Sequence, residues 1–278
     1  MRRMKIVTDS SANVFELTDV GFAFAPLKIV TAEKEFVDDR SLNVDDMVRY
    51  FDKYKGTSKT SCPNPSDWLT AFGDGEDIFC VTITSGLSGS YNAACAAKQI
   101  YETEHPDRRV CVIDSLSAGP EMQLIIEKLG EWIAQGRDFD DICRAIDAYS
   151  HQTGLVFMLE SLKNFAANGR VSPATAKITG LLGIRIVGKA SDVGTLEPLH
   201  KCRGEAHSLT AIVNHLKSSG LSCGKVRIAH CENTDAASRL KERILALLPK
   251  AEIAISACKG LCSYYAEKGG LLIGFEKA

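Results

Sequence analysis

The sequence predicts an α/β fold in which an N-terminal, Rossmann-like domain on a parallel sheet precedes a C-terminal α+β domain. In the first half, short β-branched runs alternate with polar loops and helical stretches, which is typical of repeated βα units. Three of the predicted strands end in small polar residues, at Asp9-Ser10, Thr84-Ser85 and Asp114-Ser115. After residue 154 this regular alternation stops. We therefore expect two domains, 1–154 and 155–278, each long enough to bury a core.

The elements of the first half follow from apolar spacing and from proline positions. Period-two or continuous apolar runs predict strands at Met4–Thr8, Phe22–Val30 with a break at Pro26, Lys34–Asp39, Ile78–Thr84 and Arg109–Ile113. Helical spacing predicts helices at Val44–Tyr54, Asp67–Phe72 with Ser66 as N-cap, Ala93–Tyr101, Glu121–Gln135 and Asp138–Ser150. Pro63 and Pro65 exclude a helix from the preceding residues, so Lys59–Pro65 is expected to be a loop or an extended segment.

The second half mixes short helices with strands. Strands are expected at Leu155–Leu159, Ile184–Val187, Thr195–His200, Val226–Cys231, Glu252–Ser256 and Leu271–Phe275, and the second and third should pair as a hairpin. Helices are expected at Leu162–Ala167, Pro173–Leu182, Glu205–Ser218 and Asp235–Leu247. This order predicts a mixed sheet in the C-terminal domain.

Composition excludes several classes of protein. The net charge is −2 and no block of Lys or Arg stands out, which argues against a nucleic-acid partner. No apolar run has the length of a membrane span, and the basic start Met1–Met4 lacks the apolar segment of a signal peptide. The ten cysteines form no CxxC pair, and Cys258 and Cys262 lack two further metal ligands at a suitable spacing. We expect a reduced, cytoplasmic setting and no metal or cofactor.

The segment Thr82–Ala94 carries the first candidate site. It joins a β-branched strand to an alanine-rich helix through three serines and two glycines. Such a junction offers unpaired backbone N–H groups, the positive end of a helix dipole and hydroxyl donors, all of which suit an anionic oxygen. The alternative is an ordinary βα loop in which a serine serves only as N-cap.

Other candidate donors lie outside this segment. Thr60 and Ser61 precede the proline pair, and Arg170 follows Gly169 at a helix break. Two hydroxyls, loop N–H groups and a guanidinium could together bind a carboxylate or a phosphate. Alternatively, Thr60 and Ser61 could belong to an ordinary capped loop, and Arg170 could be a surface cation that caps the end of a helix. The chain shows no standard nucleotide-binding or hydrolase motif, and its scattered histidines support no catalytic triad.

Six short motifs, in this order and at these distances, resemble the DegV family of bacterial fatty-acid-binding proteins. They are Lys5–Ser11 (KIVTDSS), Lys59–Pro63 (KTSCP), Thr84–Ala94 (TSGLSGSYNAA), Val112–Ser115 (VIDS), Asn168–Ser172 (NGRVS) and Leu181–Val187 (LLGIRIV). They are similar to the family's D-S turn, T-S-x-P-S, S-S-x-L-S-G-T-Y-x-S-A, V-I-D-S, G-G-R-I-S and L-L-N-I-K-P-I-L motifs. The resemblance covers nearly the whole chain.

The resemblance implies a lipid-binding subunit that is not itself an enzyme. One long-chain fatty acid would lie in a tunnel between the two domains, without any other cofactor. Thr60 and Ser88 would hold its carboxylate, with Ser61 and the Gly89 N–H close by. The protein would present this carboxylate to a separate ATP-dependent fatty acid kinase of the dihydroxyacetone-kinase-like type, which makes the acyl-phosphate. Arg170 would serve that transfer or contact the kinase.

The chain departs from the family pattern at several positions. Asn64 stands in place of a serine, Asn168 in place of a glycine, and Arg185–Ile186 in place of Lys-Pro. The histidine that often precedes a C-terminal G-P-G is absent, and Tyr265 is expected to occupy its place. Two other functions remain open from the residues alone. One is a transferase with Ser88 as nucleophile, and the other is a module that binds a small anion.

Overall fold

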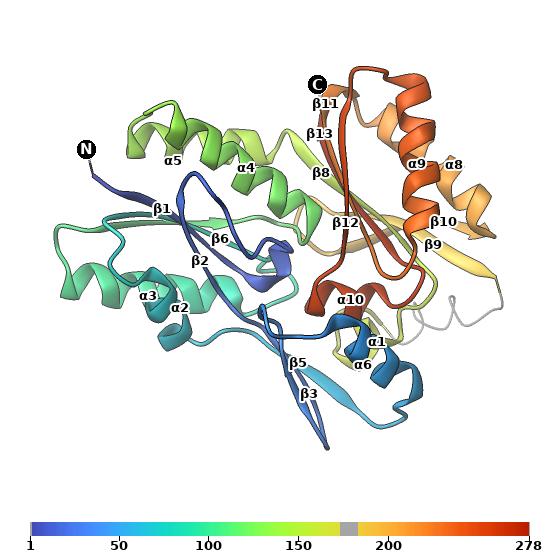
Figure 1. Cartoon of the computed structure of the whole chain (residues 1–278), viewed down its shortest axis with the longest axis horizontal. Helices are drawn as coiled ribbons and strands as arrows, with labels where there is room; N and C mark the ends of the chain where they lie inside the picture. The colour runs from blue at the N-terminus through green and yellow to red at the C-terminus, as the bar shows by residue number, and fades with distance from the viewer. Residues whose placement is uncertain (1, 173–182, 278) are drawn as a thin grey trace.

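A four-stranded sheet forms the centre of the N-terminal half of the chain (Figure 1). The computed structural model describes residues 2–172 and 183–277. The sheet has the order β2-β1-β6-β7, and its strands are β1 (Met4–Asp9), β2 (Gly21–Ala25), β6 (Asp77–Thr82) and β7 (Arg109–Asp114). All three strand pairs are parallel. The predicted parallel sheet is therefore confirmed.

Helices cover both faces of this sheet because its strands are apolar on both sides. Val7 and Ile78 pack in one cluster with α2 (Pro65–Phe72) and α3 (Ser90–Glu104). Ile6 and Phe79 are sequence neighbours of these residues and face the opposite way, toward α4 (Pro120–Ala134).

A six-stranded mixed sheet forms the C-terminal half. Its order is β10-β9-β8-β13-β11-β12, and only the β11–β12 pair within it is parallel. The strands are β8 (Thr153–Leu159), β9 (Ile184–Ala190), β10 (Leu196–Arg203), β11 (Leu221–His230), β12 (Glu252–Ala257) and β13 (Leu271–Lys277). Helices α8 (Glu205–Ser218) and α9 (Thr234–Leu247) cover one face, and α4 packs on the other.

Helix α4 therefore lies between the two sheets, and α5 (Phe139–Ser150) packs beside it (Figure 1). Glu127 of α4 binds Arg227 of β11 through two N–O contacts of 2.7 Å. The largest apolar cluster contains residues from both sheets, Phe79 and Phe157 among them. The two halves share this core, and the domain boundary at residue 155 stays a prediction.

A small antiparallel sheet with the order β4-β3-β5 extends from the first half. Its strands are β3 (Lys28–Thr31), β4 (Glu35–Val37) and β5 (Ser58–Ser61). Three helices of the chain lie near it: α1 (Val44–Lys53), α6 (Lys163–Ala167) and α10 (Gly260–Ala266), while the short 3-10 turn η1 (Ser10–Ala12) contacts α10. This arrangement brings segments that are 200 residues apart in sequence to one place, as the contact between Ser58 and Tyr264 shows.

Several local predictions need correction. Asn64, not Ser66, is the N-cap of α2, because its side chain accepts from the N–H groups of Ser66 and Asp67. Helix α3 begins at Ser90 rather than Ala93. Helix α10 was not predicted, because its seven residues include glycine and two tyrosines, which are weak helix formers. The predicted helix Pro173–Leu182 lies outside the described residues.

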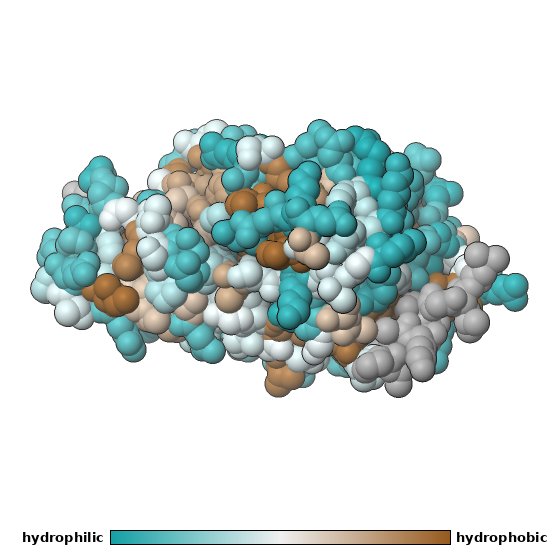
Figure 2. Space-filling view, turned by 90° about the horizontal axis from the view of Figure 1, so that it is seen from below, coloured by the Kyte–Doolittle hydropathy of each residue, from teal (hydrophilic) through white to brown (hydrophobic). Residues whose placement is uncertain are grey.

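The outer surface is mixed in character. Figure 2 shows a face on which hydrophilic residues predominate and hydrophobic residues form small groups. Within residues 2–172 and 183–277, no helix combines the length and the apolar character that crossing a membrane would require.

Candidate functional site

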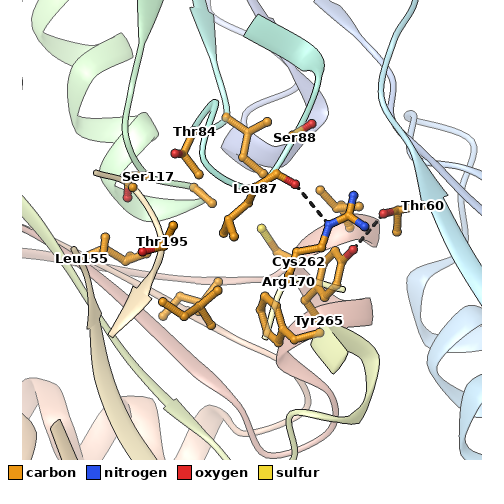
Figure 3. A pocket seen from close by; sticks show the side chains of 18 of the residues that line it. Thr60, Thr84, Leu87, Ser88, Ser117, Leu155, Arg170, Thr195, Cys262 and Tyr265 are labelled. Carbon is orange, nitrogen blue, oxygen red and sulfur yellow. Dashed lines mark hydrogen bonds between the residues drawn. The ribbon is translucent and has the colours of Figure 1, made fainter. Parts of the chain in front are cut away.

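A cavity of about 330 Å³ lies between the two halves of the chain (Figure 3). Most of its wall is apolar. The N-terminal half contributes Leu27, Ile83, Leu87 and Ala118, and the C-terminal half contributes Leu155, Phe157, Leu159, Phe165, Leu196, Leu261 and Leu272. The volume falls at the lower end of the range that small-molecule pockets occupy. The walls therefore suit an apolar ligand of modest width.

The five residues singled out from the sequence all line this cavity. Thr60 and Ser61 come from β5, Ser88 and Gly89 from the β6–α3 loop, and Arg170 from the segment after α6. The end of β5 and the β6–α3 loop are close together. A Cβ built on Gly89 would lie 3.2 Å from the Sγ of Cys62, the residue after Ser61. The tertiary structure thus places hydroxyls from residues 60 and 88 along one wall.

The β6–α3 loop is held from behind by a buried carboxylate. Asp9, at the end of β1, accepts hydrogen bonds from Ile83 N–H at 2.9 Å and from the Ser90 hydroxyl at 2.7 Å. Ser11 also donates to it through its N–H at 3.2 Å. Burial raises the pKa of Asp9, and these hydrogen bonds act in the opposite direction. Asp9 thus connects the end of β1 to the end of β6 and to the start of α3. It does not itself line the cavity.

The N-terminus of α3 faces the candidate site, and its N-cap, Gly89, has no side chain with which to cap the helix. Ser88 Oγ accepts the N–H of Ser90 at 3.3 Å, which leaves the Ser88 O–H able to donate. The N-cap of α3 is therefore not a serine, although Ser88 caps the first N–H group of the helix from the position before the N-cap. Unpaired N–H groups and the helix dipole favour an anion here.

Thr60 is held by two residues whose contacts the sequence did not reveal. Its hydroxyl lies 2.8 Å from the Tyr265 hydroxyl, and its N–H donates to Asn168 Oδ1 at 3.0 Å. Burial raises the pKa of Tyr265, so its phenol stays protonated at neutral pH. Tyr265 lies on α10, which is why periodicity could not place it. The only signal for either residue was its departure from the motifs quoted above.

Arg170 joins the second half of the chain to the β6–α3 loop. Its Nε donates to the carbonyl oxygen of Leu87 at 3.1 Å, and its Nη1 donates to the carbonyl oxygen of Asn168. Figure 3 shows its guanidinium beside Thr60 and Tyr265, on the opposite side of the pocket from Leu155 and Thr195. The side around Arg170 therefore carries a guanidinium and several donors. The rest of the lining is mainly apolar but includes Lys189 and the hydroxyls of Thr84, Ser117 and Thr195.

The cavity lining offers few groups for acid–base chemistry. Of the described residues that line the cavity, none is a histidine, an aspartate or a glutamate. An activated serine requires a general base, and this lining offers Ser88 neither an imidazole nor a carboxylate for that task. Within the described part of the chain, no three His, Cys, Asp or Glu side chains are grouped to hold a metal ion.

Comparison with known protein families gives one match across the chain. A family model described as an uncharacterised protein of the DegV family matches residues 3–278. A DegV domain-containing protein of Streptococcus pneumoniae strain R6 is 44% identical over 276 residues, which are 98% of either chain. A DegV domain-containing protein of Streptococcus gordonii is 40% identical over the same share of both chains.

Two crystal structures share the fold closely. The DegV family protein from Eubacterium eligens, loaded with heptadecanoic acid, has a TM-score of 0.97 and 43% identity, over 99% of this chain and 100% of that one. The Fatty Acid Kinase B3 protein of Streptococcus pneumoniae, loaded with linoleic acid, has a TM-score of 0.97 and 44% identity over the same shares. The mixed α/β architecture is that of these proteins.

Proposed function

The chain belongs to the DegV family, and we propose that it binds one long-chain fatty acid and presents the carboxylate to a separate ATP-dependent fatty acid kinase. The observation that carries this proposal is the cavity itself. Its walls are apolar, and Thr60, Ser88 and Arg170 gather on one side of it. The related chains loaded with heptadecanoic and linoleic acids support the same ligand class.

The two parts of the cavity would have different tasks. Burying an acyl chain gains roughly 0.8 kcal/mol per CH₂, so the apolar walls supply most of the affinity. The polar side supplies orientation, because desolvating a carboxylate is costly unless donors replace its water. Thr60, Ser88 and the Gly89 N–H are neutral donors. They would hold the carboxylate without an ion pair so tight that it could no longer react.

The kinase would supply ATP and the phosphoryl-transfer machinery. A carboxylate oxygen attacks the γ-phosphorus of ATP, the bond to the β–γ bridging oxygen breaks, and the products are an acyl-phosphate and ADP. This chain would contribute the aligned carboxylate, and Arg170 would contact the transferred group or the kinase. The printed name of the 44% identical Fatty Acid Kinase B3 protein supports such a partnership. A kinase of the dihydroxyacetone-kinase-like type is the partner we propose.

The two other functions fit the cavity less well. A transferase with Ser88 as nucleophile would require a base, and the described lining provides no histidine or carboxylate. A module for a small anion would use only the polar side and would leave a cavity of about 330 Å³ unfilled. A long apolar chain with one anionic end uses both parts.

Native mass spectrometry tests the proposed ligand. Protein purified from bacteria should retain an added mass of about 250–300 Da, that of an acid whose chain fills the apolar part. The double variant Thr60→Ala with Ser88→Ala should bind added fatty acid more weakly, each change costing about 0.5–3 kcal/mol. The matched control is Ser66→Ala with Thr70→Ala on α2, where both side chains are exposed.

Two results would refute this proposal. One is protein that retains no such mass and does not bind added long-chain acids after delipidation. The other is a Thr60→Ala, Ser88→Ala variant that binds the acid as tightly as the control does. The first result would refute fatty-acid binding. The second would refute the assignment of Thr60 and Ser88 to the carboxylate.

A further inference from the structure

The side-chain amide of Asn168 is fully used in contacts with three different elements. Its Oδ1 accepts the Thr60 N–H of β5 at 3.0 Å. Its Nδ2 donates to the Asn164 carbonyl of α6 at 2.9 Å and to the Tyr264 hydroxyl of α10 at 3.0 Å. The orientation of the amide is fixed, because a backbone N–H can only donate and a carbonyl can only accept.

The contact with Thr60 satisfies one backbone N–H at the edge of a sheet. The order β4-β3-β5 leaves β5 at the edge, so the outward N–H groups of this strand have no partner within the sheet. Asn168 supplies the acceptor for the one at Thr60, which is only partly exposed to solvent. Without that acceptor the Thr60 N–H would have to shift toward water, and the hydroxyl on the same residue would move with it.

The main chain of Asn168 reaches the other half of the site. Its carbonyl oxygen accepts from Arg170 Nη1, and Arg170 Nε donates to the Leu87 carbonyl at 3.1 Å. Leu87 directly precedes Ser88. Asn168 is thus connected to the Thr60 donor through its side chain and to the Ser88 loop through Arg170.

From these contacts we infer that Asn168 is a positioning residue that sets the preference of the cavity for a carboxylate over an uncharged head group. This inference rests on the proposed function. Asn168 lies outside the cavity lining and acts through Thr60, whose N–H its side chain accepts. Hydrogen bonds to a charged acceptor are roughly twice as strong as neutral ones. Misplacing the Thr60 hydroxyl therefore costs a carboxylate more affinity than it costs an alcohol with the same chain.

The test compares two probes that share one chain, a hexadecenoic acid and the corresponding hexadecenol, on delipidated protein. Asn168→Ala should weaken acid binding about five- to tenfold and alcohol binding by less than about twofold, since one aligned hydrogen bond is lost. The matched control is Asn164→Ala. Asn164 lies on α6, the helix that Asn168 directly follows, and its side chain donates to the Tyr264 carbonyl at 2.7 Å. It should leave the acid-to-alcohol ratio of affinities unchanged.

A double-mutant cycle with Thr60→Ala identifies the route. If Asn168 acts through Thr60, the acid affinity of Thr60→Ala should fall by less than about twofold when Asn168→Ala is added. If the alanine variant folds poorly, Asn168→Ser provides a second variant. Its side chain is polar but too short to reach the Thr60 N–H. It should lower the same ratio.

An unchanged acid-to-alcohol ratio in both Asn168 variants would overturn the inference, and so would additive effects in the cycle. An equal loss for acid and alcohol would also overturn it, since that would show a general structural role. A wild-type protein that binds neither probe would instead refute the proposed function, so the two failures are distinguishable.

Discussion

At the residue scale, the candidate site is built from groups that keep one charge state near neutral pH. Thr60 and Ser88 do not titrate there, and burial raises the pKa of Tyr265 further above neutrality. Burial likewise raises the pKa of Cys262, the thiol on the same helix. The donors of this site are therefore constant over the range in which a histidine would change its charge.

The role proposed for Arg170 can be tested separately from ligand binding. Arg170→Ala should leave fatty-acid affinity largely intact, because the apolar walls and the hydroxyls remain. It should reduce acyl-phosphate formation with the partner kinase by about tenfold or more, since a positioned cation at the transferred charge is lost. Equilibrium binding of the acid measures the fatty-acid affinity. Phosphate transfer from labelled ATP measures acyl-phosphate formation.

The control for this variant is Arg144→Ala on α5. Arg144 is an exposed arginine that pairs with Asp141, and it does not line the cavity. Transfer at the wild-type rate by the Arg170 variant would contradict its assigned role. Loss of fatty-acid binding in that variant would show instead that Arg170 belongs to the ligand clamp.

At the scale of elements, helix α10 depends on a buried carboxylate from the other half of the chain. Asp38 is fully buried, and it accepts the N–H groups of Gly260 at 2.8 Å and Leu261 at 2.9 Å. Burial raises the pKa of Asp38 from 3.8 to about 6. This residue thus fixes the start of the helix that carries Tyr265, at the cost of keeping a charge away from water.

That pKa predicts how stability changes with pH. The folded protein binds the proton of Asp38 more tightly than the unfolded chain does, so the contribution of Asp38 to stability is largest at low pH. It is lost as pH rises from about 4 through 6. Relative to Asp38→Asn, the wild-type free energy of unfolding should therefore fall by about 1–1.5 kcal/mol between pH 5 and pH 7.

Urea denaturation of both proteins at these two pH values measures the difference. Comparison with the asparagine variant cancels the other carboxyl groups that titrate in the same range. Asp147→Asn, at an exposed position of α5, is the control for removing one carboxylate from the protein. A constant difference between wild type and Asp38→Asn would show that the pKa of Asp38 is not raised.

At the scale of the whole molecule, the two halves of the chain meet at the cavity wall, where the β9–β10 turn packs against the β6–α3 loop. Gly194 has a φ of +71°, and a Cβ at this position would lie 1.9 Å from Thr84 Oγ1. A Cβ at Gly86 would lie 2.7 Å from the Val193 carbonyl oxygen. Two glycines thus allow a contact between the halves that no larger residue permits, and it lies at the cavity wall.

Gly194→Ala should separate the turn from the loop and speed the release of a bound fatty acid. The matched control is Gly204→Ala, at a φ of +79° with no atom within 4 Å of the added Cβ. Both variants place a Cβ at a positive φ, which strains the backbone, but only the first adds the clash. Stopped-flow displacement of a fluorescent fatty acid gives the release rates. Equal rates for the two variants would show that this contact does not retain the ligand.

The parallel sheet and most helices could be predicted from the amino-acid sequence, and so could the polar residues that line the cavity. These features depend on local signals. The spacing of apolar residues predicts strands and helices. Ser88 follows a predicted strand closely, so its place at the carboxyl edge of the sheet was predictable. Thr60 was identifiable only because prolines fix the chain beside it and because its motif is similar to one of a known family.

The groups that hold those residues could be identified only from the folded chain. Asn168 and Tyr265 meet Thr60 across 108 and 205 positions of the chain, and Asp38 caps a helix that starts 222 positions later. Such contacts have no local period, since they arise when elements pack. Helix α10 is short and buried on nearly all sides, so neither propensity nor amphipathic spacing marks it. Packing alone brings it to the cavity, and with it the tyrosine that completes the polar side.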